Sequence, residues 1–237
     1  MANLATNSVT RTTLLSALEE KRRHQMKKYL LHRLFFVALL REERQDGEIT
    51  AYHELLFQKI QKFHLGEPAS GILLLYSNCI FHILEASSGT LYHILMDLAT
   101  FEDEGPQALL QDIKILVMSH NIPTRLFAQW SATKVEVPIT IGYDTQVQST
   151  EEVITECLTL VLKMGVYLAT LKMNSKGLGD NLHTLVPELL IPAETIKYLC
   201  KTKECLSPRE FLKMYYDPLQ PQMDAETVWP TPAHLAV

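Results

Sequence analysis

The sequence predicts an α+β fold class, a ferredoxin-like sandwich of order β-α-β-β-α-β with one added strand, an N-terminal helix and a helical C-terminal extension. Two observations support this prediction. Apolar runs of strand length alternate with segments of helical periodicity between residues 31 and 135. The two central runs, residues 72–75 and 79–84, are separated by only three residues, which is typical of an antiparallel hairpin.

The first predicted element is a helix at residues 12–29. Ser16 and Glu19 have the spacing of a capping box, and no glycine or proline interrupts the segment. Its second half carries five basic side chains, Lys21, Arg22, Arg23, Lys27 and Lys28. Such a run is usually a solvated helix face, and the alternative is a docking site for an acidic partner.

The first strand and the helix that follows it are predicted from two different periodicities. Residues 34–40 form a continuous apolar run, typical of a strand that is covered on both faces. Side chains at steps of three and four residues then predict a helix with one stripe over the sheet: Tyr52, Leu55, Leu56, Lys59, Ile60 and Phe63.

The third strand places one titratable group in an apolar row. Alternate residues of a strand share a face, so His82 is expected on the face opposite to Phe81 and Glu85. We expect this histidine to be neutral, with one ring nitrogen hydrogen-bonded to backbone or water.

The remaining elements follow in order. Ser87 or Ser88 can cap a helix whose buried stripe is Leu91, Ile94, Leu95 and Leu98. Strands are predicted at residues 113–118 and 126–130. Later helices are predicted from Thr150, from Pro192 and from Pro208. The predicted organisation is an N-terminal helical segment (1–30), the sandwich (31–135), a helical extension (136–217) and a proline-rich tail (218–237).

Composition and charge exclude several classes of protein. A net charge of −5 and a pI near 6.0 give no electrostatic reason to expect a nucleic-acid partner. Four cysteines without metal-type spacing favour reduced thiols in a cytosolic compartment. The most apolar segment, residues 153–171, contains Glu156 and Lys163 and is interpreted as a buried or docked helix. We therefore expect a soluble, intracellular protein with no membrane partner.

Three segments together resemble the BLUF domain, the blue-light sensor that uses FAD. They are LHRLFF at the first strand, GILLLYSNCIFHILEA at the central hairpin and RLFAQWSA near the end of the sandwich. The chain as a whole resembles the animal testis-expressed BLUF-like proteins, which are associated with sperm and their flagella.

The resemblance also implies that the flavin chemistry is lost. In the photoactive family, a tyrosine on the first strand and a glutamine on the third exchange hydrogen bonds beside the flavin ring. These positions fall on Phe36 and His82, and an asparagine that holds the flavin falls on His64. Phenylalanine has no hydroxyl to take part in that network. Trp130 falls near the family's flexible tryptophan.

We therefore predict a non-enzymatic structural or interaction protein without a cofactor, catalytic residues or a metal. By the resemblance, it would act in the cytoplasm or the flagellar axoneme of male germ cells. Its interaction candidates are the basic side chains of residues 21–28 and the aromatic Tyr215, Tyr216 and Trp229.

Three alternatives remain open. The chain could be a sensor that retains FAD or another nucleotide between the two sandwich helices. His64 and His82 could bind a metal with a third ligand. Cys200 or Cys205, interleaved with lysines, could be a thiol of low pKa.

Overall fold

The computed structural model describes most of the predicted sandwich and extension. The described residues are 13–14, 16–17, 19–20, 30–41, 46–63, 67–135, 148–170 and 182–216. The basic side chains of residues 21–28, His64, Trp229 and the predicted tail at 218–237 lie outside them.

Five strands form one mixed sheet. They are β1 (Leu31–Leu40), β2 (Ser70–Leu75), β3 (Cys79–Ser87), β4 (Leu110–Ser119) and β5 (Trp130–Lys134). The strand order is β4-β1-β3-β2-β5, in which β5 alone pairs parallel to its neighbour. The first four strands have the antiparallel order of the ferredoxin-like fold. The predicted fold class is therefore confirmed.

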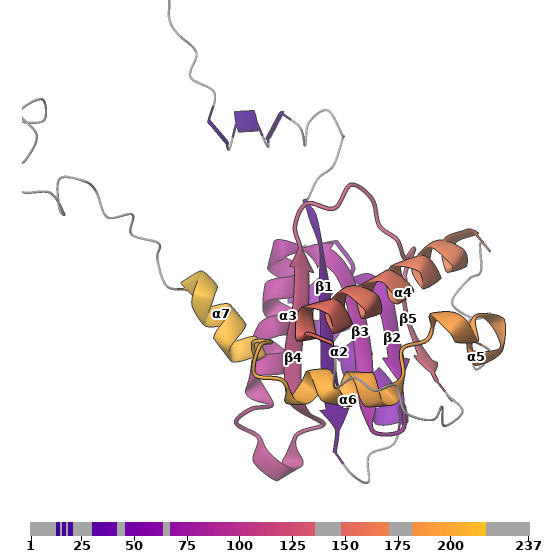
Figure 1. Cartoon of the computed structure of the whole chain (residues 1–237). Coiled ribbons are helices and arrows are strands. Elements are labelled where there is room, and N and C mark those ends of the chain that lie inside the picture. The colour runs from indigo at the N-terminus through magenta and orange to yellow at the C-terminus, as the bar shows by residue number, and fades with distance from the viewer. Residues whose placement is uncertain are drawn as a thin grey trace, which may run out of the picture.

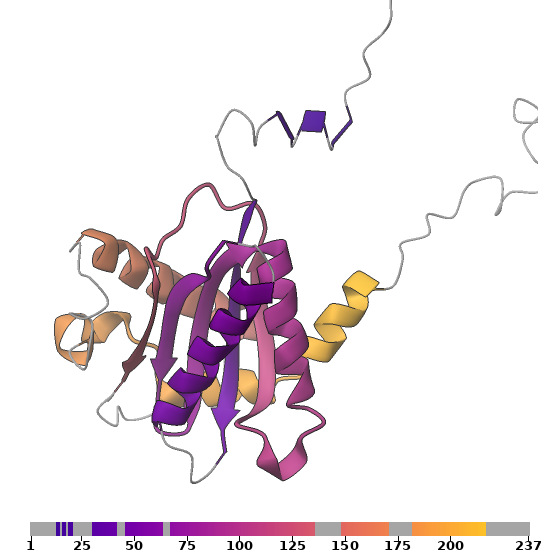
Figure 2. The same ribbon diagram turned by 180° about the vertical axis from the view of Figure 1, so that it is seen from behind.

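Helices cover both faces of this sheet (Figures 1 and 2). They are α2 (Asp46–Phe63), α3 (Ser88–Thr100), α4 (Thr150–Thr170), α5 (Leu182–Leu185), α6 (Ala193–Lys201) and α7 (Pro208–Tyr216), with the short 3-10 helices η1 (Gly105–Gln107) and η4 (Pro187–Leu189). One face packs against α2 and α3, and the opposite face packs against α4 and α6. α7 lies beside the β4 edge and contacts α3.

Two apolar cores result from the alternation of side chains along β3. Ile80 and Leu84 belong to the core under α2 and α3, whereas Phe81 and Ile83 belong to the core under α4 and α6. The predicted assignment of faces is confirmed.

Helix α4 is long and apolar enough, by length and composition, to cross a membrane, and it is the one such helix among the described residues. Its buried side chains Val153, Cys157 and Val161 belong to the second core. The predicted docking of this segment against the protein is confirmed.

The predicted stripe of α2 is wrong in part. Leu55 and Phe63 are 64% and 68% exposed. The buried side chains of this helix are Ile49, His53, Leu56 and Ile60, at steps of four, three and four residues. The helix is rotated so that this second stripe faces the sheet, because three of its four members are aliphatic.

Two predicted element ends are also corrected. β5 begins at Trp130 and not at residue 126, because the backbone N–H groups of Leu126 and Phe127 donate to the Glu85 carboxylate and not to a strand. At the N-terminus, Thr13 and Ser16 cap each other reciprocally, in place of the predicted Ser16 and Glu19 pair.

Candidate functional site

The two strand positions that the resemblance singled out are paired in the sheet. Phe36 of β1 lies directly opposite His82 of β3, and their ring centroids are 5.0 Å apart. Neither side chain is exposed to solvent. The structure therefore brings these two residues together at the floor of the space under α2.

Trp130, at the start of β5, is hydrogen-bonded to His82. Its indole N–H donates to Nε2 of His82 over 2.9 Å. Since an indole nitrogen can only donate, Nε2 must accept, and the proton of the neutral imidazole lies on Nδ1. Burial and the neighbouring His53 hold the pKa of His82 well below its ordinary value. The predicted neutral state agrees with this direction, although the hydrogen-bond partner is an indole and not backbone or water.

His53 on α2 packs against the His82 ring from the opposite layer. Its ring centroid lies 4.6 Å from that of His82, and its Nδ1 lies 2.9 Å from the carbonyl oxygen of Ile49. Nδ1 is therefore the donor, which leaves Nε2 as an acceptor. Burial lowers the pKa of His53 to about 4. Among the described residues, neither this Nε2 nor Nδ1 of His82 has a hydrogen-bond partner.

Aromatic side chains fill the space around the two imidazoles. The Trp130 ring stacks at 25° to the His53 ring and contacts the edge of Phe57 with centroids 5.3 Å apart. Tyr52 reaches across from α2 to α3, where its hydroxyl donates to the Asp97 carboxylate. Burial and this contact raise the pKa of Tyr52. The two sandwich helices are thereby tied together over the sheet.

A small cavity lies between the last turns of α2 and the start of α3. The cavity lined by Phe57, Ile60 and Thr90 measures about 10 Å³, which is room for a single water molecule. Small-molecule sites usually measure about 300–1,000 Å³. The rings of Phe36, His53 and His82 pack directly on one another, with centroids 5.0 Å apart for Phe36 and His82 and 4.6 Å apart for His53 and His82.

A buried charge cluster fixes the loop that leads to Trp130. The Glu85 carboxylate, with no exposure, accepts from Nε and Nη2 of Arg33 at 2.7 and 2.6 Å. It also accepts from the backbone N–H groups of Leu126 and Phe127. Arg125 donates to the backbone oxygen of Glu85 over 2.6 Å. These contacts hold residues 125–127 in place and so position the indole that follows.

The thiol alternative does not fit the described side chains, and the metal alternative rests partly on His64, which lies outside them. While Trp130 holds the proton of His82 on Nδ1, neither nitrogen of that ring offers a lone pair to a metal. The described residues include no group of three or more metal-binding side chains. All four cysteines are free and buried, and burial raises the pKa of Cys200 and Cys205.

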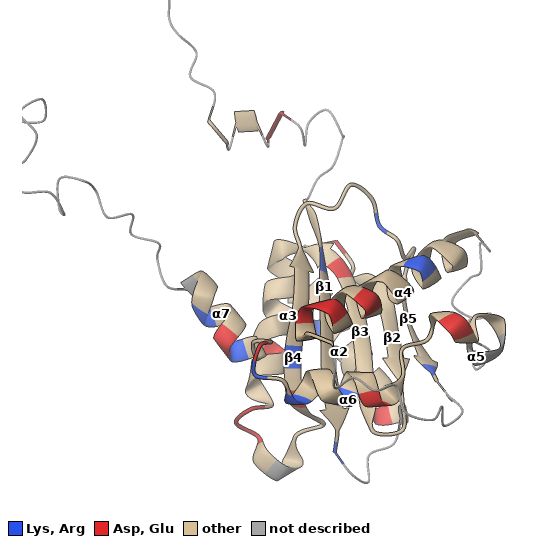
Figure 3. Ribbon diagram, viewed as in Figure 1, with Lys and Arg blue, Asp and Glu red and all other residues tan. Residues whose placement is uncertain are grey.

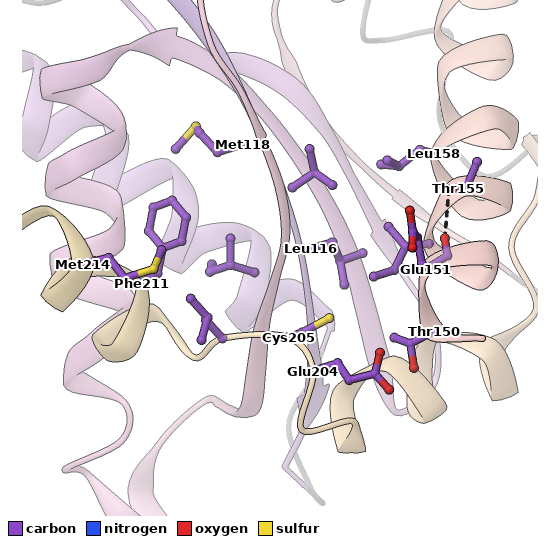
Figure 4. Close-up of a pocket in the computed structure, with 14 residues that line it drawn as sticks. Leu116, Met118, Thr150, Glu151, Thr155, Leu158, Glu204, Cys205, Phe211 and Met214 are labelled. Carbon is purple, nitrogen blue, oxygen red and sulfur yellow. Dashed lines mark hydrogen bonds between the residues drawn. The ribbon is translucent and has the colours of Figure 1, made fainter.

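A groove of about 540 Å³ lies along the free edge of β4 (Figure 4). β4 forms its floor, α4 one wall and α7 the other. Its apolar lining includes Leu116, Met118, Ile154, Leu158, Phe211 and Met214. Two carboxylates, Glu151 and Glu204, also line it. Figure 3 shows that acidic residues gather along the first half of α4.

The aromatic interaction candidates at the end of α7 lie near this groove. Tyr215 is 60% exposed and follows Met214, which lines the groove. Tyr216 is the last residue of α7, and the structure does not describe its side chain.

A sequence model of the family described as testis-expressed protein 47 matches residues 30–217. This range runs from the residue before β1 to the residue after α7 and is more than half of the chain. The chain belongs to this family.

Several solved structures of BLUF proteins are similar at low identity. The dark-state BLUF protein BlrB is 19% identical, with a TM-score of 0.33, and the match covers 45% of this chain and 73% of that one. The BlrP1 BLUF structure is 17% identical, with a TM-score of 0.33, and the match covers 46% of this chain and 66% of that one. A bacterial light-regulated adenylyl cyclase is 18% identical, with a TM-score of 0.32, and the match covers 60% of this chain and 40% of that one. At these TM-scores the likenesses carry no conclusion about what this chain binds or senses.

In this member of the testis-expressed protein 47 family, the predicted positions Phe36, His82 and Trp130 lie in one cluster. Sequence reasoning missed His53, which packs on His82 from the opposite layer. The spacing of Ile49, His53 and Leu56 was the available signal, because it places the histidine within a stripe of aliphatic residues.

Proposed function

We propose that this chain is a non-enzymatic interaction protein that acts in the cytoplasm or the flagellar axoneme of male germ cells and carries no flavin. The hydrogen bond from Trp130 to His82 is the observation that carries the proposal. This bond joins two side chains of the aromatic cluster at the position where the resemblance would put the flavin ring.

The ionisation of the buried groups supports a non-enzymatic role. A catalytic acid or base works best when its pKa lies near the working pH. Burial instead lowers the pKa of His53 to about 4 and raises the pKa of Cys79 and Cys157 to about 12. These side chains stay uncharged near neutral pH and serve packing.

The germ-cell setting is supported by the family. The description of the family is testis-expressed, and its match includes α4, α6 and α7 as well as the sandwich. The helices of the extension are thus part of what defines the family, and two of them form the walls of the groove along β4.

That groove is the surface on which we place the partner. An edge strand offers unpaired backbone groups to an incoming strand. One residue of this edge is already paired within the chain. The N–H of Ile115 donates to the backbone oxygen of Leu206 over 2.9 Å, in an isolated antiparallel bridge. The partner would continue this line along β4 as an extended protein segment. Its apolar side chains would enter the groove, and a basic side chain would meet Glu151 and Glu204.

The test is a comparative capture from germ-cell lysate with quantitative identification of the bound proteins. The groove variant carries Glu151→Lys and Met214→Lys, two exposed positions at which substitution should leave the fold intact. The control is Phe63→Lys, an equally exposed apolar side chain on α2.

We expect flagellar proteins bound by the wild type and by the control to fall at least about tenfold in the groove variant. Equal recovery with all three proteins would contradict the groove as the docking surface. Recovery of no flagellar protein by the wild type would contradict the germ-cell role.

A further inference from the structure

Helix α4 packs one side on the second core, and no described element lies over its other side (Figure 1). Only 33% of the residues in its most apolar stretch are buried. Four exposed residues at steps of three and four share the uncovered side, which we call the outer face of α4: Glu156, Thr159, Lys163 and Val166. Most of this apolar helix is therefore left outside the core by the described part of the chain.

The uncharged side chains of the outer face do not need water as a hydrogen-bond acceptor. The hydroxyl of Thr159 donates to the backbone oxygen of Thr155 over 2.8 Å. Thr170, one turn beyond Val166, donates in the same way to the backbone oxygen of Tyr167 over 2.6 Å. Val166 itself is apolar and 56% exposed. A protein surface could cover this part of the helix without leaving a hydroxyl donor unpaired.

The two charged side chains of the outer face have opposite signs and no partner among the described residues. Neither Glu156 nor Lys163 forms an ion pair there. Side chains of one helix meet at spacings of three and four residues, whereas these two are seven residues apart. No acidic residue lies within four positions of Lys163 on either side. Whatever covers this face should therefore present one acidic and one basic group.

A second copy of the same helix presents these groups in the right order. In a twofold symmetric contact, residue i of one copy meets residue j of the other, and j meets i. We propose that two copies of this chain associate through the outer faces of their α4 helices, which run antiparallel. Glu156 of each copy then meets Lys163 of the other.

The position of the symmetry axis agrees with the length of the helix. The two charged residues are equally far from a point between Thr159 and Leu160, and α4 runs from Thr150 to Thr170. The axis thus passes close to the middle of the helix, so the two copies overlap along nearly its whole length of about 30 Å. A threonine beside the axis is small enough for two helices to approach to about 8–10 Å.

The outer face is separate from the groove along β4. The groove is lined by Ile154 and Leu158, which lie about 100° around the helix from the outer face. Both surfaces can therefore be occupied at once. This inference does not depend on the proposed function, and its failure would leave that proposal untouched.

The experiment is sedimentation equilibrium of the full-length protein. We expect the wild type to form a dimer in the micromolar range. Glu156→Lys and Lys163→Glu each bring like charges together, so each should weaken the dimer at least about tenfold. The matched control is Lys59→Glu, an exposed lysine on α2, which should dimerise as the wild type does. Circular dichroism establishes that each variant is folded.

A mixture of the two single variants tests the antiparallel arrangement directly. One variant carries two acidic groups on its outer face and the other carries two basic groups. Each charge meets its opposite only when the two variants pair, so the mixture should recover the dimer that each variant alone has lost. A mixture that stays monomeric, or single variants that dimerise as the wild type does, would overturn the proposal. A wild type that is monomeric throughout the micromolar range would also overturn it, whatever else binds this face.

Discussion

Trp130 and His82 form a hydrogen bond between the first residue of β5 and the middle of β3, two strands that are not neighbours in the sheet. The indole must therefore lie over β2 to reach the imidazole. This position fixes the tautomer of His82 and places an aromatic ring above the floor that Phe36 and His82 make. The side chains of the protein itself thus occupy the space between sheet and α2.

Replacing Trp130 by phenylalanine removes the donor and leaves Nε2 of His82 buried without a partner. We expect a loss of about 1–3 kcal/mol in the free energy of unfolding, the usual cost of an unpaired buried polar atom. Urea denaturation of the wild type and of Trp130→Phe measures it. In a double-mutant cycle with His82→Phe, the two losses should not add. Full additivity would mean that the hydrogen bond contributes nothing.

The stability of the protein should fall as the pH drops below the ordinary pKa of histidine. His53 has a pKa of about 4 in the folded state, so the unfolded chain binds more protons between that value and about 6.5. From about pH 7 to about pH 5 this one group should cost about 2 kcal/mol. His53→Gln should lose this part of the pH dependence in urea denaturation. An unchanged slope in the variant would show that His53 is not held neutral by burial.

The buried carboxylate of Glu85 should contribute far more to stability than the carboxylate of Glu67, whose side chain is 36% exposed. Glu85→Gln leaves Arg33 with an unpaired, largely buried charge, which should cost about 3–5 kcal/mol. Glu67→Gln removes a partner of Arg125 at the surface and should cost less than about 1 kcal/mol. Chemical denaturation compares the two. Similar losses would contradict the role of Glu85 in fixing the loop before Trp130.

Any substitution of Gly71 should lower the stability of the protein. Its φ is 146°, and an added Cβ would lie 1.9 Å from the backbone oxygen of Ile83. Gly71→Ala should therefore destabilise the central hairpin strongly, because the contact is with rigid backbone. Gly89→Ala is the control, since its Cβ would point into open space and alanine favours a helix. We expect a large fall in melting temperature for the first variant and no fall for the second.

The fold could be predicted because periodicity and turn spacing are local properties of the sequence. The hairpin of β2 and β3, the buried stripe of α3 and the cap of α7 follow from residues within a few positions of each other. The start of β5 could not be predicted in this way. It depends on the carboxylate of Glu85, which lies more than 40 residues earlier in the chain and binds the amides that a strand would have used.

The site could be predicted only where the resemblance gave a position. Phe36 and His82 were identified because they replace named residues of a known domain. His53 comes from the opposite layer. Contacts of this kind depend on packing between elements, which a single sequence does not specify.

The central claim is that the protein's own aromatic side chains fill the place where the resemblance would put a flavin. Its most direct test is to express the full chain in riboflavin-rich medium, purify it, denature it and measure the flavin fluorescence of the filtered supernatant against a known BLUF protein treated in parallel. The account predicts far less than one flavin per chain. One flavin per chain would contradict it.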